Sequence, residues 1–185
     1  WREHFDKLLN GEAWIENRMM LHAEHFRSGE LLGTWDALNE VVVGRGHLLR
    51  PVRLSASVDG GHLTSYVADG LIASTPTGST AYALAAGGPI LPPELRNILL
   101  VPIAPHLSVD RAVVLSEGSA VGIRVNGDNA VLSVDGQASI TLMEDDHIDV
   151  RAADVTTQFV RFGDPGYFYR NLTAHMNENS LGLPR

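Results

Sequence analysis

One stretch, residues 69–88, concentrates the side chains whose chemistry could serve a ligand. Within it, a short apolar run, residues 71–73, is followed by five hydroxyl residues in seven positions. Pro76 and Gly78 lie between these hydroxyl residues. Hydroxyl groups at this density can form hydrogen bonds with a sugar, an amide or the edge of a purine. A plain serine- and threonine-rich turn with an ordinary helix cap is the alternative interpretation. Composition alone leaves both open.

The same stretch predicts a strand, a turn and a short helix in succession. Residues 71–73 favour a buried strand end, and Pro76 and Gly78 prevent the strand from continuing. Residues 81–86 are good helix formers that the following glycine pair can stop. Because the first amides of a helix lack internal partners, we expect an anion site there, with Ser79 as the helix N-cap rather than a ligand.

Several catalytic motifs are absent from the sequence. Gly78 is followed by serine rather than lysine, which excludes a Walker A loop. There is no Gly-x-Ser-x-Gly nucleophile elbow, no Gly-x-Gly-x-x-Gly dinucleotide fingerprint and no His-Glu-x-x-His zinc motif among the eight histidines. We therefore expect no metal site in this chain.

Composition and charge narrow the class of protein. The 185 residues include 44% hydrophobic residues, no cysteine and a formal net charge of −8. This predicts a globular fold without disulfides and disfavours a nucleic-acid or anionic membrane partner. No apolar run approaches the roughly 20 residues that span a bilayer. These features are typical of a cytoplasmic protein.

Short segments separated by turn signals predict a mainly β fold with a few short helices. We expect one long strand over residues 35–43, an Asp59-Gly60 hairpin, two separate strands over residues 147–152 and 156–162, and a closing helix over residues 167–176. The type of residues 13–25 is ambiguous. Further strands are expected over residues 52–58, 63–68, 97–103, 112–115, 120–125, 130–134 and 139–143. Such spacing is typical of a β-sandwich. We expect one domain, residues 1–185, with a loose tail over residues 177–185.

The central motif, Asp69-Gly70 followed by Thr75-Pro-Thr-Gly-Ser-Thr-Ala-Tyr82, resembles the signature of NAD kinases. Asn39-Glu40 resembles the Asn-Glu motif of that family, and the segments 9–21, 102–106 and 134–137 also match it in kind. The resemblance covers nearly the whole chain. It implies the β-sandwich-like C-terminal domain of the NAD kinase fold, in an α+β protein whose N-terminal α/β half this sequence lacks.

The resemblance also implies a set of NAD-binding residues. The Asn of the Asn-Glu motif contacts adenosine in this family, the Glu frames the nicotinamide end, and the Asp before Gly70 binds the nicotinamide ribose or amide. The alternatives to a binding role are structural. Asn39 and Glu40 could be solvated polar residues, Asp69 a turn residue and Tyr82 part of the core. The residues implied are Asn39, Glu40, Asp69, Thr77, Thr80, Ala81, Tyr82, Ala104 and His106.

The implied reaction moves a phosphoryl group from ATP, or from polyphosphate, to the 2′-hydroxyl of the adenosine ribose of NAD, giving NADP, with Mg²⁺ as the metal. The Gly-Gly-Asp-Gly motif that supplies the base in this family is absent from the sequence. We therefore expect no catalytic residue in this chain, which would be the C-terminal part of a longer protein, bind the dinucleotide and be inactive alone. A dimer or tetramer is implied as well.

Two alternatives remain at this point. A lipid or diacylglycerol-type kinase is a distant relative with a similar β-rich half. A non-catalytic nucleotide-binding or oligomerisation module is the other. A preference for NAD and NADP over other ligands would favour the NAD kinase interpretation.

Overall fold

The computed structural model describes residues 1–46, 50–106, 109–127, 130–137 and 139–172. They fall into two compact units, one formed by Arg18–Thr157 and the other by Trp1–Asn17 with the chain from Gln158 onward. The prediction of a single domain over residues 1–185 stays a prediction, and the expected tail, residues 177–185, lies outside the described residues.

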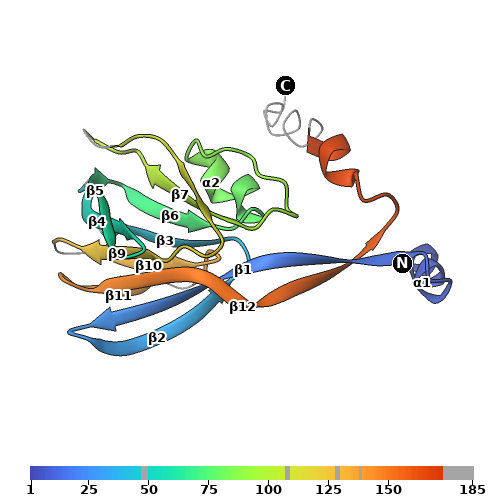
Figure 1. The fold of residues 1–185 in the computed structure, drawn as a ribbon, viewed down its shortest axis with the longest axis horizontal. Coiled ribbons are helices and arrows are strands. Elements are labelled where there is room, and N and C mark those ends of the chain that lie inside the picture. The colour runs from blue at the N-terminus through green and yellow to red at the C-terminus, as the bar shows by residue number, and fades with distance from the viewer. Residues whose placement is uncertain (47–49, 107–108, 128–129, 138, 173–185) are drawn as a thin grey trace, which may run out of the picture. The chain divides into compact units, whose positions relative to one another are not determined.

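Two six-stranded antiparallel sheets make up the architecture (Figure 1), which confirms the mainly β fold. Sheet 1 has the order β2-β1-β12-β9-β4-β5, with bounds Glu30–Ala37, Ala13–Arg27, His147–Phe162, Val121–Val125, Val52–Val58 and Gly61–Ala68. Sheet 2 has the order β11-β10-β3-β6-β7-β8, with bounds Ile140–Leu142, Ala130–Val134, Glu40–Arg45, Gly70–Ser74, Asn97–Ile103 and Val113–Ser116.

The main core of the larger unit lies between the sheets. Leu21 and Leu54 of sheet 1 meet Leu71 and Leu100 of sheet 2, and all four are fully buried. Alternate residues of each strand point into this core, as the two-residue period of a strand requires. Burying each such side chain stabilises the fold by about 1.5–3 kcal/mol.

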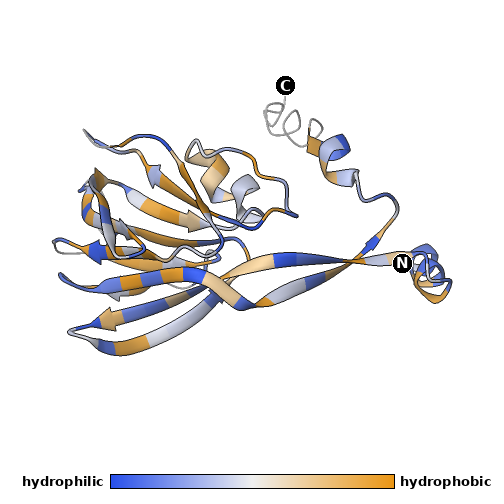
Figure 2. Ribbon diagram, viewed as in Figure 1, coloured by the Kyte–Doolittle hydropathy of each residue, from blue (hydrophilic) through white to orange (hydrophobic). Residues whose placement is uncertain are grey.

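Sheet 2 buries its outer face as well. Ile72, Leu99 and Val101 point away from the main core and pack with Ala83 of α2 (Tyr82–Ala85) and with Leu91 of the loop that follows. Figure 1 shows α2 over this face, and Figure 2 shows β6 and β7 apolar along most of their length. All five residues of β6 are buried, so this strand is covered on both faces and paired on both edges.

The strand expected over residues 35–43 is wrong in one respect. β2 ends at Ala37 and β3 begins at Glu40, so Leu38 and Asn39 form a bend between two strands. The amides of this bend donate to a carboxylate from a distant turn instead of continuing a strand ladder.

The two strands expected over residues 147–152 and 156–162 are one continuous strand, β12. The acidic residue between them, Asp154, has a 95% exposed side chain and does not break the backbone path. Residues 13–25, ambiguous in the sequence, lie in β1.

The helices are few and short. α1 covers Arg2–Leu9, a single 3₁₀ turn covers Gly78–Thr80, and the helix expected over residues 81–86 is the four-residue α2. Residues 167–172 are helical, and the rest of the expected closing helix lies outside the described residues. Among the described residues, none of the helices is long and apolar enough to cross a membrane.

The smaller unit is organised by a buried carboxylate. Glu16 accepts a hydrogen bond from the Arg161 guanidinium at 2.7 Å and from the Tyr167 hydroxyl at 3.2 Å. The Trp14 indole donates to the Gly163 carbonyl at 2.9 Å. These contacts join the start of β1 to the end of β12 and to the chain that follows it.

The larger unit also holds a buried charged cluster. The Asp146 carboxylate is fully buried and accepts two hydrogen bonds from Arg27, at 2.8 and 2.9 Å, and one from the Met143 amide. His25 lies 2.9 Å from the same carboxylate. Burial raises the pKa of Asp146, but the hydrogen bonds from Arg27, the Met143 amide and His25 together outweigh burial and lower it to about 2.

We expect Asp146→Asn to lower the free energy of unfolding by about 2–4 kcal/mol at pH 7, because Arg27 and His25 would then face an uncharged buried partner. Denaturant unfolding measures the loss. Because the folded pKa lies below the usual 3.8, this stabilisation is present above pH 3.8 and is lost as the pH falls toward 2, where variant and wild type should converge.

Asp154→Asn is the matched control, since its exposed carboxylate lies 3.9 Å from Arg151. We expect this control to change the free energy of unfolding by less than about 0.5 kcal/mol. A loss in Asp146→Asn no larger than that of the control would contradict a stabilising role for the cluster.

Candidate functional site

The buried strand β6 carries predicted site residues beyond each of its ends. Asp69 precedes the strand, and the hydroxyl-rich loop that begins at Thr75 follows it. Because β6 is paired with β3 on one edge and β7 on the other, neither end can shift without disturbing sheet 2. The two ends are therefore rigid supports for whatever they hold.

Thr75 ties the loop after β6 to the bend between β2 and β3. Its amide donates to the Asn39 carbonyl at 2.9 Å, and its hydroxyl donates to the Leu38 carbonyl at 2.6 Å. The Ser74 hydroxyl donates to the same Asn39 carbonyl at 3.0 Å. The backbone beneath the predicted ligand residue Asn39 is thus fixed by two buried hydroxyl residues.

Gly78 brings the loop closer to this bend than a larger residue could. A Cβ atom at this position would lie 2.2 Å from the Asn39 carbonyl oxygen and 2.5 Å from the Ser74 hydroxyl. Both neighbours are held by the hydrogen bonds just described, so moving either of them would break a hydrogen bond. Glycine is required here for close approach rather than for an unusual backbone angle.

Ser79 has a different role from the predicted N-cap. Its hydroxyl donates to the Pro76 carbonyl at 2.6 Å and accepts from the Leu91 amide at 2.9 Å, which joins the loop to the segment after α2. The N-cap positions are Thr77 for the 3₁₀ turn and Ala81 for α2, and neither side chain caps its helix, while the Thr75 hydroxyl accepts the Gly78 amide at 3.0 Å.

The anion site expected at the start of the helix stays a prediction, because that helix is α2, and the amides whose partners are known here belong to the 3₁₀ turn before it. The Gly78 and Ser79 amides donate to the Thr75 hydroxyl and carbonyl, and the Ala81 amide donates to the Gly78 carbonyl. A single tight 3₁₀ turn satisfies its own donors in this way, whereas a longer helix leaves its first amides open. These amides are therefore not free for a phosphate.

The outer side of the loop carries the exposed predicted residues. Thr80 and Ala81 are exposed, and the Tyr82 side chain is 46% exposed, which excludes core packing for this ring. Thr77 is half-buried, and its hydroxyl accepts a hydrogen bond from the buried Arg18 guanidinium at 3.0 Å. The loop thus presents an aromatic face and hydroxyl groups together.

The bend is held from its other side by Asp135. The carboxylate of this residue accepts the amides of Leu38 at 2.7 Å, Asn39 at 2.8 Å and Glu40 at 2.9 Å. The Asp135 amide in turn donates to the Glu40 carbonyl at 3.0 Å. Three successive amides are therefore satisfied by one side chain.

Glu40 is a buried carboxyl group with spare hydrogen-bonding capacity. The residue is 7% exposed, and within the described residues its Oε2 atom is buried without a hydrogen-bond partner. Burial raises the pKa of Glu40, and the charge of Asp135 raises it further, while a hydrogen bond from the Tyr82 amide partly offsets both. A buried oxygen without a partner is costly unless a ligand satisfies it.

A second group of predicted residues lies at the opposite end of β6. The Asp69 carboxylate pairs with the Arg45 guanidinium at 2.9 Å, and its backbone is fixed by hydrogen bonds to Ile103 and Arg45. Ala104 is exposed with a left-handed φ of 44°, and the His106 amide donates to the Val67 carbonyl at 2.7 Å.

The predicted residues therefore separate into two groups. Asn39, Glu40 and the loop that contains Thr77, Thr80, Ala81 and Tyr82 lie beyond the Ser74 end of β6. Asp69, Ala104 and His106 lie beyond its Gly70 end. At about 3.3 Å per residue along a strand, Asp69 and Thr75 are roughly 20 Å apart.

Four residues that hold the predicted site residues in place were not themselves predicted as ligand residues: Arg18, Arg45, Thr75 and Asp135. Arg18 and Asp135 lie in segments that resemble the family, 9–21 and 134–137. The resemblance therefore pointed to these segments but predicted no role for the two residues. Nothing in the local sequence around Arg45 indicates its partner.

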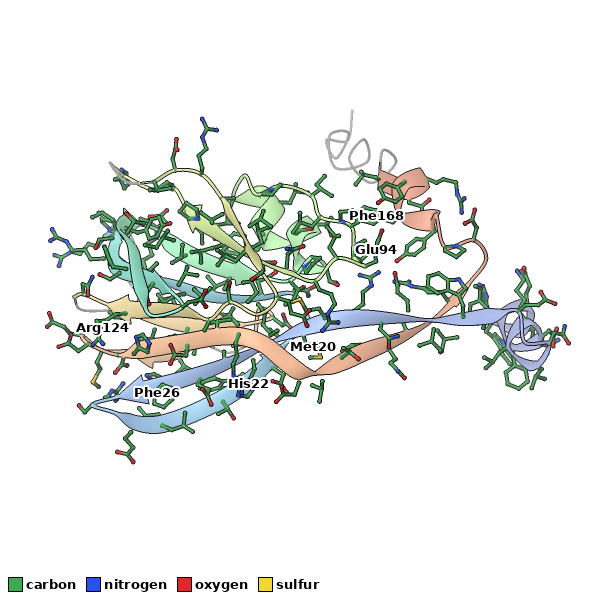
Figure 3. All side chains as sticks on the ribbon, in the orientation of Figure 1. Met20, His22, Phe26, Glu94, Arg124 and Phe168 are labelled. Carbon is green, nitrogen blue, oxygen red and sulfur yellow. The ribbon has the colours of Figure 1, made fainter. Side chains whose placement is uncertain are left out.

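A cavity of about 570 Å³ lies elsewhere, on sheet 1. Phe26 and Arg124, which lie toward the end of the sheet where β1 and β2 are joined, are labelled in Figure 3. The charged side chains that line this cavity lie close to one another: His147 is 2.6 Å from Asp149, and Arg124 is 3.9 Å from Asp145. None of the predicted ligand residues lines this cavity.

Across the described part of the chain, no group of three or more His, Asp or Glu residues is arranged to hold a metal ion. The Mg²⁺ that the resemblance implies is therefore not matched by a ligand set here, and no chemical step is assigned to it.

Comparisons with known proteins identify the family of this chain. The model of the ATP-NAD kinase C-terminal domain matches residues 38–162, which contain both groups. An NAD kinase from Chloroflexus aggregans is 41% identical over 175 residues, covering 94% of this chain and 63% of the relative. One from Heliobacterium modesticaldum is 42% identical over 165 residues, covering 88% and 58%. The chain thus spans about three fifths of the length of these curated relatives.

Solved structures give the same result. Yeast NADH kinase complexed with NADH matches with a TM-score of 0.88 at 28% identity, over 100% of this chain and 55% of that one. An NAD kinase from Archaeoglobus fulgidus in complex with ATP matches with a TM-score of 0.77 at 26% identity, over 95% of this chain and 65% of that one. This chain belongs to the ATP-NAD kinase C-terminal domain family.

Proposed function

We propose that this chain binds NAD for an NAD kinase, which transfers a phosphoryl group from ATP or polyphosphate to the 2′-hydroxyl of the adenosine ribose. One observation carries the proposal: the loop from Thr75 to Tyr82 is locked onto the Asn39-Glu40 pair, inside the segment that matches the family. Polar and aromatic groups held rigidly together can orient a ribose and a base.

Each residue has a role that its surroundings support. Within the described residues the Asn39 side chain makes no hydrogen bond, although its backbone is fixed on both sides. Its side-chain amide is therefore free to form hydrogen bonds with adenosine. The unpartnered Glu40 oxygen can accept from a hydroxyl of the dinucleotide. The exposed Tyr82 ring offers a surface for stacking.

The relatives support the ligand class. The structure of the yeast relative holds NADH, and that of the Archaeoglobus fulgidus relative holds ATP. We expect this chain to prefer NAD or NADP, with ATP binding more weakly to the chain alone.

The part of the relatives that this chain does not span is expected to supply the base and most phosphate contacts. The 185 residues contain no Gly-Gly-Asp-Gly sequence, and the amides of Gly78, Ser79 and Ala81 in the central loop are bonded internally. Phosphoryl transfer depends mainly on positioning and on stabilising charge. This chain would position the acceptor ribose.

Asn39 is the residue expected to contact adenosine. Asn39→Ala should weaken NAD binding by about 1–3 kcal/mol, or roughly 5- to 150-fold, by leaving an adenosine group without its partner. Calorimetry with NAD, NADP and ATP measures both the loss and the order of preference. Asn17→Ala, at an exposed asparagine of β1, is the control and should leave NAD affinity unchanged. A folded Asn39→Ala protein with wild-type affinity would remove Asn39 from the site.

A further prediction concerns assembly. Since Asp69 and Thr75 are roughly 20 Å apart along one rigid strand, we expect Asp69, Ala104 and His106 to complete the site of a second copy, in a dimer or tetramer. Light scattering should show an oligomer. A monomer of about 20 kDa that binds NAD tightly would contradict a shared site.

Mixing two variants tests the sharing directly. Asn39→Ala and Asp69→Ala should each bind NAD weakly, but subunits exchanged between them would form some sites with both residues intact. For a dimer with random exchange, about a quarter of the sites should recover. No recovery, with subunit exchange confirmed by mass, would place both residues in a site within one copy.

Another prediction concerns activity. The chain alone should form no NADP above background from NAD, ATP and Mg²⁺, because a positioned base commonly contributes about 10²–10⁴-fold and each oxyanion donor about 10²–10³-fold. A protein of the full length of the relatives is the positive control. Robust turnover by the 185 residues would mean that one of their own carboxylates acts as the base, with Asp69, Asp135 and Glu40 the first to test.

A further inference from the structure

Two turns of the same kind connect strands in this chain. Asp59-Gly60 joins β4 to β5, and Asp135-Gly136 follows β10. Both aspartates have left-handed φ angles, 50° and 47°, and so do both glycines, 79° and 68°. Positive φ at both central residues is the geometry of a type I′ turn, which Asn-Gly and Asp-Gly favour equally.

The carboxylates of these two turns differ in what they hold. Asp59 accepts one amide, that of Ala120, at 2.8 Å. Asp135 accepts three successive amides, Leu38 to Glu40, from a segment at least 95 residues away in the sequence. A turn of this type needs no carboxylate and no hydrogen bonds to a distant segment. The turn alone therefore does not explain why Asp135 binds the amides of Leu38 to Glu40.

The Asn39 peptide is consequently gripped from both directions. Its amide donates to Asp135, and its carbonyl accepts from Thr75 and Ser74. The same carboxylate binds the amide of Glu40, the next predicted ligand residue. Without Asp135, three partly buried amides would lose their partner at the point where β2 gives way to β3.

We propose that Asp135 is the positioning residue of the dinucleotide site: its carboxylate sets the backbone of Asn39 and Glu40, and through them the affinity for NAD, without touching the ligand. This inference rests on the proposed function. It adds a residue whose effect on binding is exerted through the ligand residues.

The test compares Asp135→Asn with Asp59→Asn in the full 185-residue chain. Asparagine tolerates the left-handed backbone, so both turns should be retained while each carboxylate charge is removed. We expect Asp135→Asn to weaken NAD binding by about tenfold or more, as loss of charged hydrogen bonds at the bend implies, and Asp59→Asn to leave it within about twofold. Asp135→Asn that is folded and binds NAD as well as Asp59→Asn does would overturn the proposal.

A pH profile separates positioning from a general loss of stability. Burial raises the pKa of Glu40 the most, the charge of Asp135 raises it further, and a hydrogen bond from the Tyr82 amide lowers it. Asp135→Asn should therefore move the Glu40-dependent step in NAD affinity to lower pH, whereas Asp59→Asn should leave that step in place. An unmoved step in a folded Asp135→Asn protein counts against the proposal.

Hydrogen exchange tests the same contact without a ligand. The amides of residues 38–40 should exchange slowly in the wild type and faster in Asp135→Asn, with no change in Asp59→Asn. If the wild-type chain binds no NAD, the proposed function fails, while faster exchange in Asp135→Asn still supports Asp135 as the holder of the bend. If Asp135→Asn does not fold, wild-type exchange decides, and rates like those of exposed loops would overturn the proposal.

Discussion

The carbonyl oxygen of Asn39 is the atom on which the candidate site depends. It accepts the Thr75 amide and the Ser74 hydroxyl, and Gly78 passes so close that a Cβ atom would come within 2.2 Å of it. A partly buried carbonyl that has two donors stabilises a single arrangement of bend and loop, since separating them would leave polar groups unpaired. The loop keeps its shape because β6, from which it emerges, is buried on both faces.

The strands that alternate or run apolar were predictable from sequence, and the bend was not. Residues 52–58 and 97–103 are strands with the predicted bounds, because their patterns match one-sided and two-sided burial. Around Leu38, by contrast, the pattern of residues 35–43 gives no sign of a break. Its cause is a carboxylate at least 95 residues away, and single-sequence periodicity carries no such information.

The hydroxyl-rich loop shows the same limit at the level of the site. Its density of hydroxyls predicted a polar binding surface, but Ser74, Thr75 and Ser79 are used inside the protein, to hold carbonyls and one another's segments. Thr80 is exposed, and Thr77 is half-buried with its hydroxyl bonded to Arg18. Composition cannot divide these two classes, because both serine and threonine serve equally well as internal clamps and as ligand donors.

This division matters for the proposed binding of an anionic dinucleotide by an acidic chain. The net charge is −8, the amides of Gly78, Ser79 and Ala81 are bonded internally, and Arg45 is paired with Asp69. The loop and the bend beside it therefore offer hydroxyls, the Asn39 amide side chain and an aromatic ring, which suit the uncharged base and ribose better than the phosphates. Recognition of the nucleoside and neutralisation of the phosphates are then separable tasks. A rigid, internally satisfied loop is suited to the first, because it selects shape without adding charge. The second requires cations or open amides, which we expect a second copy or the two fifths of the relatives' length that this chain does not span to supply.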